Sequence, residues 1–411
     1  RPRLEDAPEY RVLSVPAVLE VLAGVLGVAA FTLVVYAGFA GTQTATANVT
    51  PTVIYVLFWV GIPVLSAVVG DVFRAFNPWL AVGRATGWVT QRVAGEDGGI
   101  EPLPYPAWLG RWPVVLGVLI FAWVELVYAN KDDPSQLAVM ALVYAAVQLV
   151  GMSLFGADTW SRRGDAFSVY FGLFARISPL HWRDRAVYRR PLLSGLPSLT
   201  PVPGTVVLLC TMIGTTSFDG FSQGTIWNSL VAHLQNDFLS LGLNAEHALE
   251  AAGTIGLLGM VALINGLYRL GIMGMHSVDR RMRTGDLAGR FAHTLVPIAL
   301  AYLVAHYFSL LAYQGQAVVF LASDPLGHGS DLLGTANNTI NYTWIGARGI
   351  WYVQVGALVI GHVAGLVLAH DRALALYHRQ RDATRSQYWM LAVMVFFTSL
   401  GLWLLSVAAQ Q

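Results

Sequence analysis

The sequence predicts an all-α, polytopic helical membrane protein with about nine transmembrane helices. Of its 411 residues, 55% are hydrophobic and only 12% are charged, whereas soluble domains average about 25% charged residues. The mean hydropathy is +0.55, and several runs of about 20 residues, the length that crosses a bilayer core, contain few or no charges. We therefore expect the lipid bilayer as the main partner. The net charge of +1 gives no indication of nucleic-acid binding, so we expect no nucleic-acid partner.

Nine apolar segments are candidate spans, and together they make residues 1–411 a single transmembrane domain. The fifth and sixth are short as written and are expected to extend by about a turn at each end. The spans are approximately 15–38, 52–70, 112–129, 134–155, 205–218, 254–268, 295–316, 352–369 and 388–407. Arginine alternates with aromatic and aliphatic residues in two of the connections, so we expect interfacial amphipathic helices at about 73–92 and 164–190.

Basic residues sort the connections into two sets. With the N-terminus inside, every basic residue falls in an inner segment except Lys131 and Arg348. Cytoplasmic loops are enriched in Arg and Lys. One span too many or too few would move every later connection to the opposite side of the membrane and would destroy this alternation. We therefore expect an N-inside, C-outside protein of a bacterial cytoplasmic membrane, with outer loops at about 221–252 and 317–350.

Four ionisable side chains lie within or at the end of predicted spans, in the middle or the outer part of the bilayer. They are Glu125, Asp219, His306 and His362. Such groups are costly in hydrocarbon and face protein or a wet cavity, which makes them candidates for function. We expect the four to converge on a cavity that opens to the outside. The plain structural alternative is that they hold the helices together by hydrogen bonds.

Imidazole and carboxylate together are the ligand set of divalent metals. His306, His362, Glu125 and Asp219 could form such a set for zinc, manganese, iron or copper. A second pair, His233 and Asp237, lies four residues apart in the predicted outer loop 221–252 and would share one face of a helix. The alternative for this pair is two solvated loop residues.

Haem is the other cofactor that these histidines could bind. His306 and His362, on neighbouring spans, could be axial ligands. His293 and His306 are thirteen residues apart, a spacing that four-helix cytochromes use. His362 and His370 are only eight apart and do not complete a two-haem pattern, so a divalent metal is favoured over haem.

Six stretches resemble a family of actinobacterial multipass membrane proteins labelled fenitrothion hydrolase, an organophosphate phosphotriesterase. The likeness extends over most of the chain. The stretches are GDVFRAFNPW (Gly70–Trp79), FSVYFGLFARISPL (Phe167–Leu180), GTTSFDG (Gly214–Gly220), AHYFSLLAYQGQ (Ala305–Gln316), SDPLGHGSDLLGT (Ser323–Thr335) and WYVQVGALVIGHVAGLVLAHDRA (Trp351–Ala373).

The resemblance implies a metal-dependent hydrolase of hydrophobic phosphotriesters. Such a reaction needs a metal-activated water and a Lewis acid on the phosphoryl oxygen, and the intramembrane histidines and acids would supply the metal ligands. Glu125 or Asp219 could equally act as general base. Arg348, the lone outer arginine, would bind the developing anion.

Two other function classes use the same residues. A transporter or proton-coupled carrier would arrange such groups as a relay from the outside to the inside. Its members would be Glu125 and His306 above, His362 midway, and His370, Asp371 and Asp158 below. A redox or accessory subunit of a larger membrane complex is the third alternative, and a homo-oligomer is compatible with all three.

Overall fold

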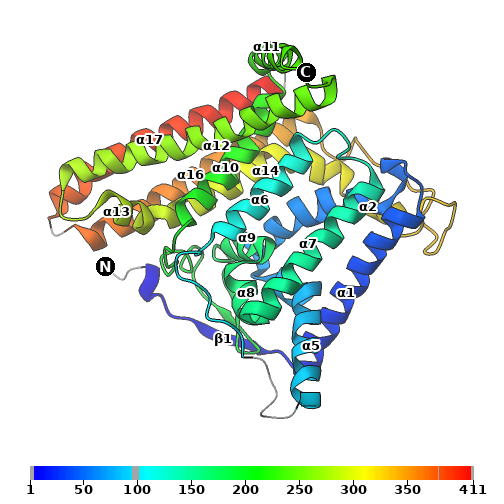
Figure 1. Cartoon of the computed structure of the whole chain (residues 1–411). Helices are drawn as coiled ribbons and strands as arrows, with labels where there is room; N and C mark the ends of the chain where they lie inside the picture. Colours follow the sequence, from blue (N-terminus) through cyan, green and yellow to red (C-terminus); the bar gives the residue numbers. More distant parts are fainter. Residues whose placement is uncertain (1–3, 95–100, 378, 409–411) are drawn as a thin grey trace.

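Nine apolar helices run between the two ends of a bundle in the computed structural model, which describes residues 4–94, 101–377 and 379–408 (Figure 1). Eight of the described helices are long and apolar enough to cross a membrane, and α6 is shorter. The chain is therefore an integral, multipass membrane protein, as its sequence predicts. The nine are α1 (Ala17–Ala40), the continuous helix of α2 (Val49–Pro51), η3 (Thr52–Gly61) and α3 (Ile62–Val69), α6 (Trp112–Leu126), α7 (Pro134–Phe155), α10 (Thr205–Ser222), α12 (Ala245–Val278), α14 (Leu295–Gln314), α16 (Ala347–Leu376) and α17 (Gln380–Ala408).

The predicted inner segments meet at one end of the bundle, which we call the arginine-rich end. Arg84 bridges Glu20 and Asp158, with N–O distances of 2.8 Å to each, and Arg372 donates a hydrogen bond to the Pro197 carbonyl. These contacts join four of the segments that the arginine pattern assigns to one side. Arg1 and Arg3, which we predict at the same end, lie outside the described residues.

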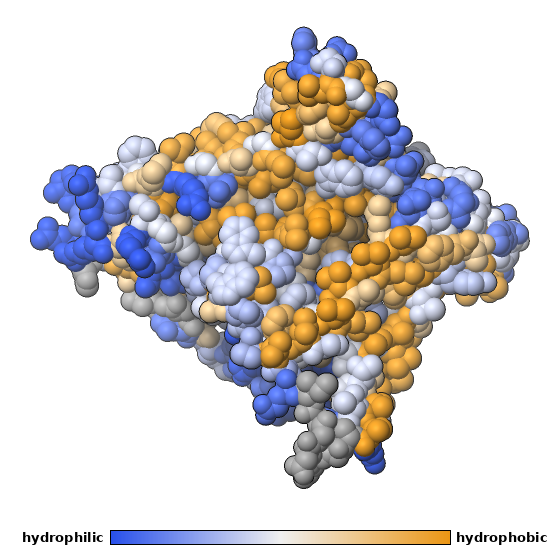
Figure 2. Space-filling view, viewed as in Figure 1, coloured by the Kyte–Doolittle hydropathy of each residue, from blue (hydrophilic) through white to orange (hydrophobic). Residues whose placement is uncertain are grey.

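The predicted outer segments meet at the opposite end. Thr42 N donates to Leu326 O, Tyr55 Oη donates to Lys131 O, and the amide nitrogen of Ala129 donates to the Glu250 carboxylate. Hydrophilic side chains gather around α13 (Thr284–Phe291) and β1 (Tyr10–Ser14) and also toward the other end, while apolar side chains cover much of the helices between them (Figure 2). The alternation of the spans therefore agrees with the contacts at both ends.

Shorter elements cover the two ends. At the arginine-rich end these are η1 (Leu4–Asp6), α4 (Val72–Phe76), α5 (Pro78–Ala94), α8 (Ala157–Arg163), η4 (Ala292–Thr294) and the strands β2 (Leu180–Arg183) and β3 (Ala186–Arg189), whereas the short helix α9 (Ala166–Ala175) lies inside the protein. At the other end they are η2 (Ala45–Ala47), α11 (Thr225–Ser240) and α15 (Ala317–Leu321). The segments expected as outer loops, 221–252 and 317–350, are thus partly helical, and α11 packs on α12 at the edge of the bundle (Figure 1).

The segment 164–190 differs from the interfacial amphipathic helix that its sequence suggested. Its helix is only the ten residues of α9, whose apolar side chains are buried in the centre of the protein. The rest forms the hairpin β2–β3, which pairs with β1 in the order β1-β3-β2. The reason is that α9 is apolar on all sides, and a helix of that kind is buried rather than laid on a surface.

Asp165 fixes the start of α9 from inside the protein. Its carboxylate is fully buried and accepts hydrogen bonds from the side chains of Asn77, Trp79, Tyr144 and Ser168. It also accepts from two backbone N–H groups of the first turn, as an N-cap residue does. Segments that are distant in the sequence are tied together at this one carboxylate.

The helices form two packed groups. In the first group α3 and α6 pack on α9, and α7 packs on α8 and α1. In the second group α10, α12, α14, α16 and α17 pack on one another. The groups touch where α10 lies against α6 and where α14 lies against η3. This junction matters for function because it is the place where side chains from both groups can meet.

Candidate functional site

Three of the predicted site residues meet at the junction between the two helix groups. Glu125 comes from α6, Asp219 from α10 and His306 from α14. His306 Nε2 is hydrogen-bonded to Asp219 Oδ2 at 2.8 Å, and Glu125 lies close enough to Asp219 for the two carboxylates to repel each other. We call these three residues the acid–histidine cluster.

The local sequence explains why Asp219 and His306 face the protein interior. On α10, Thr211, Thr215 and Asp219 recur every four residues, and this face is buried almost throughout. On α14 the residues one turn before His306, Tyr302 and Leu303, are also buried. Helical periodicity therefore turns both ionisable groups toward neighbouring helices and away from lipid.

Glu125 is the least satisfied member of the cluster. Its Oε2 atom is shielded from solvent and has no hydrogen-bond partner among the described residues. The nearest polar side chains are Tyr307 and Trp59, which interact with this carboxyl group. A shielded carboxylate oxygen without a partner is costly, and such groups call for an explanation.

Sequence reasoning missed four residues that complete the surroundings of the cluster. Tyr307, next to His306, interacts with both acids. Trp59 and Tyr55 lie on η3, a stretch wound as a π-helix, and π-helical turns often occur at functional sites. The charge of Lys131 reaches both acids. Only Lys131 carried a signal in the sequence, as the single lysine of the chain.

A small cavity of about 20 Å³ adjoins His306 on the side of Gly220. Most of the surface that lines this cavity is apolar, and its volume is about that of one water molecule. A water there would have hydroxyl groups and an imidazole as hydrogen-bonding partners. The lining residues include Thr216, Gly220, Tyr302, His306, Leu358 and Gly401.

His362 is close to this cavity but does not join the cluster. Its Nδ1 donates to the Leu358 carbonyl at 2.7 Å, and its ring centre lies 6.1 Å from that of Tyr302. The Nε2 atom is buried and has no partner among the described residues. Tyr302 thus lies beside both the cavity and His362, and it occupies the place where a direct contact between the two histidines was expected.

The remaining candidates lie elsewhere. His233 and Asp237 are exposed on α11, and the Nδ1 atom of His233 bonds to Ser229 O within that helix. Arg348 is exposed in the first turn of α16. No interaction described for the cluster includes any of the three, and their predicted roles as metal ligands and anion binder stay predictions.

The inner members of the predicted relay are also separate from the cluster. His370 is bonded to Gln387 at 2.7 Å, and Asp158 pairs with Arg74 and Arg84 in the first helix group.

A metal site is not preassembled in this arrangement. Within the residues that the structure describes, no three His, Cys, Asp or Glu side chains are grouped so that they could hold a metal ion. In the cluster, the ring nitrogen of His306 nearest the acids is already bonded to Asp219. The residues as they stand fit an acid–imidazole pair rather than a coordination shell.

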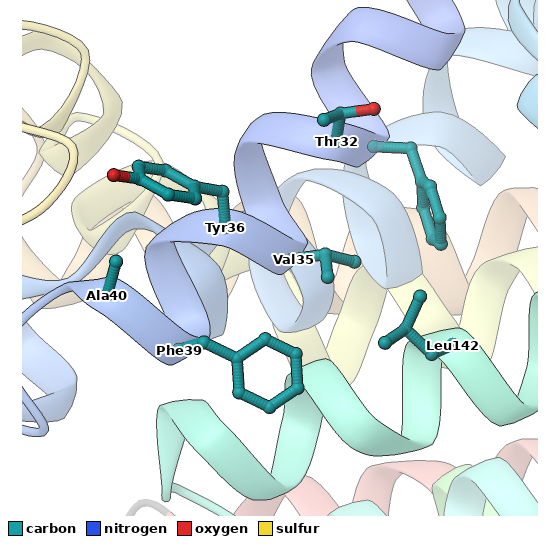
Figure 3. Close-up of a pocket in the computed structure, with 7 residues that line it drawn as sticks. Thr32, Val35, Tyr36, Phe39, Ala40 and Leu142 are labelled. Carbon is teal, nitrogen blue, oxygen red and sulfur yellow. The ribbon is translucent and has the colours of Figure 1, made fainter.

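A groove on α1 is lined mainly by apolar side chains and by none of the candidate site residues. This groove of about 400 Å³ runs between α1 and α7 and is lined by Phe31, Thr32, Val35, Tyr36, Phe39 and Leu142 among others (Figure 3). Apolar side chains at the surface of a membrane-spanning helix are expected to contact lipid. The cavity beside His306 differs from this groove in that an ionisable side chain of the acid–histidine cluster lines it.

Comparison of the chain with protein-family models, with curated proteins and with solved structures finds no match.

Proposed function

We propose that the acid–histidine cluster binds and releases protons, and that the protein is a proton-coupled membrane carrier. The observation that carries this proposal is the meeting of two carboxyl groups and one imidazole in a shielded place. Like charges close together in low dielectric cannot both ionise freely, so an arrangement of this kind retains a proton. Asp219 and His306 can exchange that proton along their 2.8 Å hydrogen bond.

The route of a proton away from the cluster supports the same proposal. The cavity beside His306 has room for about one water molecule, and Tyr302 lines this cavity and lies next to His362. The free Nε2 of His362 is a proton acceptor that nothing in the described structure satisfies. In a carrier that couples transport to protons, these groups would bind a proton in one step of the transport cycle and release it in another.

Infrared difference spectroscopy on the purified full chain tests proton binding without knowledge of the substrate. A change of pH should produce a carboxyl C=O band that Glu125→Gln or Asp219→Asn removes or shifts. Asp324→Asn is the matched control, because Asp324 is a carboxylate bonded within the loop at the same end of the bundle. If neither cluster variant alters a carboxyl band, or if Asp324→Asn removes the same band, proton binding at the cluster is refuted.

Hydrolysis is the second candidate, and one geometric feature favours it. Asp219 holds the His306 ring by Nε2, while the opposite edge of the ring, at Nδ1, faces Gly220 and the cavity. An imidazole oriented by a carboxylate is a common general base, and a water in the cavity would be within its reach. The cavity holds no molecule as large as a phosphotriester, so substrate entry would require α14 and α10 to move apart.

Metal analysis and a phosphotriester assay on one preparation separate the two candidates. A hydrolase should release the leaving group of a chromogenic phosphotriester and lose this activity on His306→Ala. If the wild type contains stoichiometric zinc, manganese, iron or copper and His306→Ala does not, the hydrolase depends on a divalent metal that His306 binds. A visible spectrum of the same sample tests for haem. If the wild-type protein contains no metal, does not cleave the phosphotriester, and shows a carboxyl band that responds to pH, hydrolysis is excluded and the carrier function is supported.

A further inference from the structure

The arginine-rich end contains three arginines with largely buried side chains, Arg111, Arg176 and Arg190, and they differ in the acids that lie near them. Arg190 lies 3.8 Å from Glu9, and Asp71 is the acid that acts on Arg176. Arg111 has no carboxylate partner among the described residues. Its closest side-chain contact there is a long one, 3.4 Å from Nη1 to Thr205 Oγ1.

Arg111 is also the arginine that needs a partner most. Its Nε is buried and unbonded within the described part of the chain. Burial, together with the nearby charge of Arg176, lowers the pKa of Arg111 to about 10. An uncompensated buried cation is unfavourable unless an anion pairs with it.

Two helix starts lie beside this guanidinium group. Arg111 immediately precedes α6, and its backbone N–H donates to Pro203 O, just before α10 begins at Thr205. Glycine makes this approach possible: Gly110 has a φ of 45°, and a Cβ at that position would lie 2.3 Å from Pro203 O. Neither helix has a side-chain cap. The first N–H of each helix is bonded in the turn before it, Trp112 N to Leu109 O and Thr205 N to Val202 O, so the two starts contribute mainly the positive ends of their helix dipoles.

We propose that Arg111 and the starts of α6 and α10 bind a phosphate group. Guanidinium groups and helix N-termini are the two protein elements best suited to phosphate oxygens, the first by paired hydrogen bonds and the second by backbone N–H groups. The phosphate can belong to an anionic lipid headgroup or to a soluble phosphate.

The surroundings favour the lipid headgroup. Trp108 is 72% exposed and Trp112 is 46% exposed, and the exposed Val202 lies beside them in the facing segment. Exposed tryptophans mark the depth of the headgroups in a bilayer. Basic pockets between membrane helices at the cytoplasmic side bind anionic headgroups, and arginine content predicts that this end is cytoplasmic.

The test uses the purified full chain in nanodiscs of phosphatidylcholine with increasing fractions of phosphatidylglycerol. The thermal unfolding midpoint reports binding, and native mass spectrometry counts the retained phosphatidylglycerol. Inorganic phosphate, titrated against sodium chloride of equal ionic strength in a neutral detergent, forms the second arm. The variants are Arg111→Gln, Arg111→Lys and, as the control of equal charge change, Arg92→Gln, whose guanidinium lies over Trp88 on the exposed part of α5.

We expect phosphatidylglycerol to raise the midpoint of the wild type and of Arg92→Gln equally. Arg111→Gln should weaken binding at least tenfold, and Arg111→Lys, which keeps the charge but loses the planar fork, should weaken it severalfold. A response to inorganic phosphate alone, lost in Arg111→Gln, supports the site and assigns it to a soluble phosphate. No response of the wild type to either probe overturns the proposal, as does unchanged affinity in Arg111→Lys or an equal loss in Arg92→Gln.

Discussion

The hydrogen bond between Asp219 and His306 should be worth about 1.5–3 kcal/mol of coupling in a double-mutant cycle. The perturbation is Asp219→Ala, His306→Ala and the double variant. The bonded atoms are 2.8 Å apart, and the two side chains are only 15% and 20% exposed. If both groups are charged, their attraction at an effective dielectric constant of about 20 is roughly 6 kcal/mol before the cost of removing them from water. The net value is smaller because that cost offsets part of the attraction.

The assay is equilibrium unfolding of the four proteins in mixed micelles titrated with sodium dodecyl sulfate. Arg283 and Asp286 form a control cycle, because their 3.0 Å ion pair is 88% and 52% exposed. Exposed pairs of this kind contribute about 0.5 kcal/mol or less. A coupling for Asp219 and His306 no larger than that of the control would refute the reasoning that this is a shielded and functional pair.

Three further predictions concern the packing and the ends of the bundle. Gly361→Ala should cost about 1–3 kcal/mol in the same unfolding assay, since its Cβ would lie 2.3 Å from the Cβ of Ala301 and would push α16 away from α14; unchanged stability would contradict this close approach. Asp165→Ala should cost at least about 3 kcal/mol, because several buried donors each lose an acceptor, and a smaller loss would mean that water replaces the carboxylate. Burial alone would raise the pKa of Asp158, but its hydrogen bond and charge interaction with Arg84 lower it below the ordinary value. Its contribution to stability is therefore present above the unfolded pKa of about 4 and is lost as pH falls through the folded pKa. Asp158→Asn should remove this part of the acid dependence, an effect of about 1 kcal/mol or less because the pair is partly exposed, and an unaltered acid limb of the pH–stability curve would exclude it.

The candidate site was only partly predictable from the sequence. Orientation and depth placed Glu125, Asp219 and His306 at a similar height, and the structure brings these three together. His362 has the same chemistry and a similar depth, yet its ring packs beside Tyr302 and is hydrogen-bonded to Leu358 O. Depth follows from position along a helix, but contact also depends on which helices are neighbours and how each is rotated, and single-residue patterns carry little of that information.

Residues that carry no charge or metal-ligand signal were missed for a related reason. Tyr307 and Trp59 read as ordinary aromatic residues of apolar helices, and only the packing of α14 on η3 brings them to the acids. The π-helical winding of η3 likewise has no sequence signature that we recognised.

By itself the sequence determined that the chain is a multipass helical protein, where its apolar helices lie and how they alternate between two ends. Eight of the described helices are long and apolar enough to cross a membrane, and α12 runs over Ala245–Val278, well beyond the expected span 254–268. The sequence could determine this much because apolar length and the placement of arginine act locally, each span responding to the bilayer alone. The tertiary structure decided the burial of α9, the pairing of β1 with β3 from residues more than 170 positions apart, and the partner of each intramembrane ionisable group. These features depend on contacts between segments that are distant in the sequence. The free energy of such a contact depends on both segments together and cannot be inferred from the local sequence of either one.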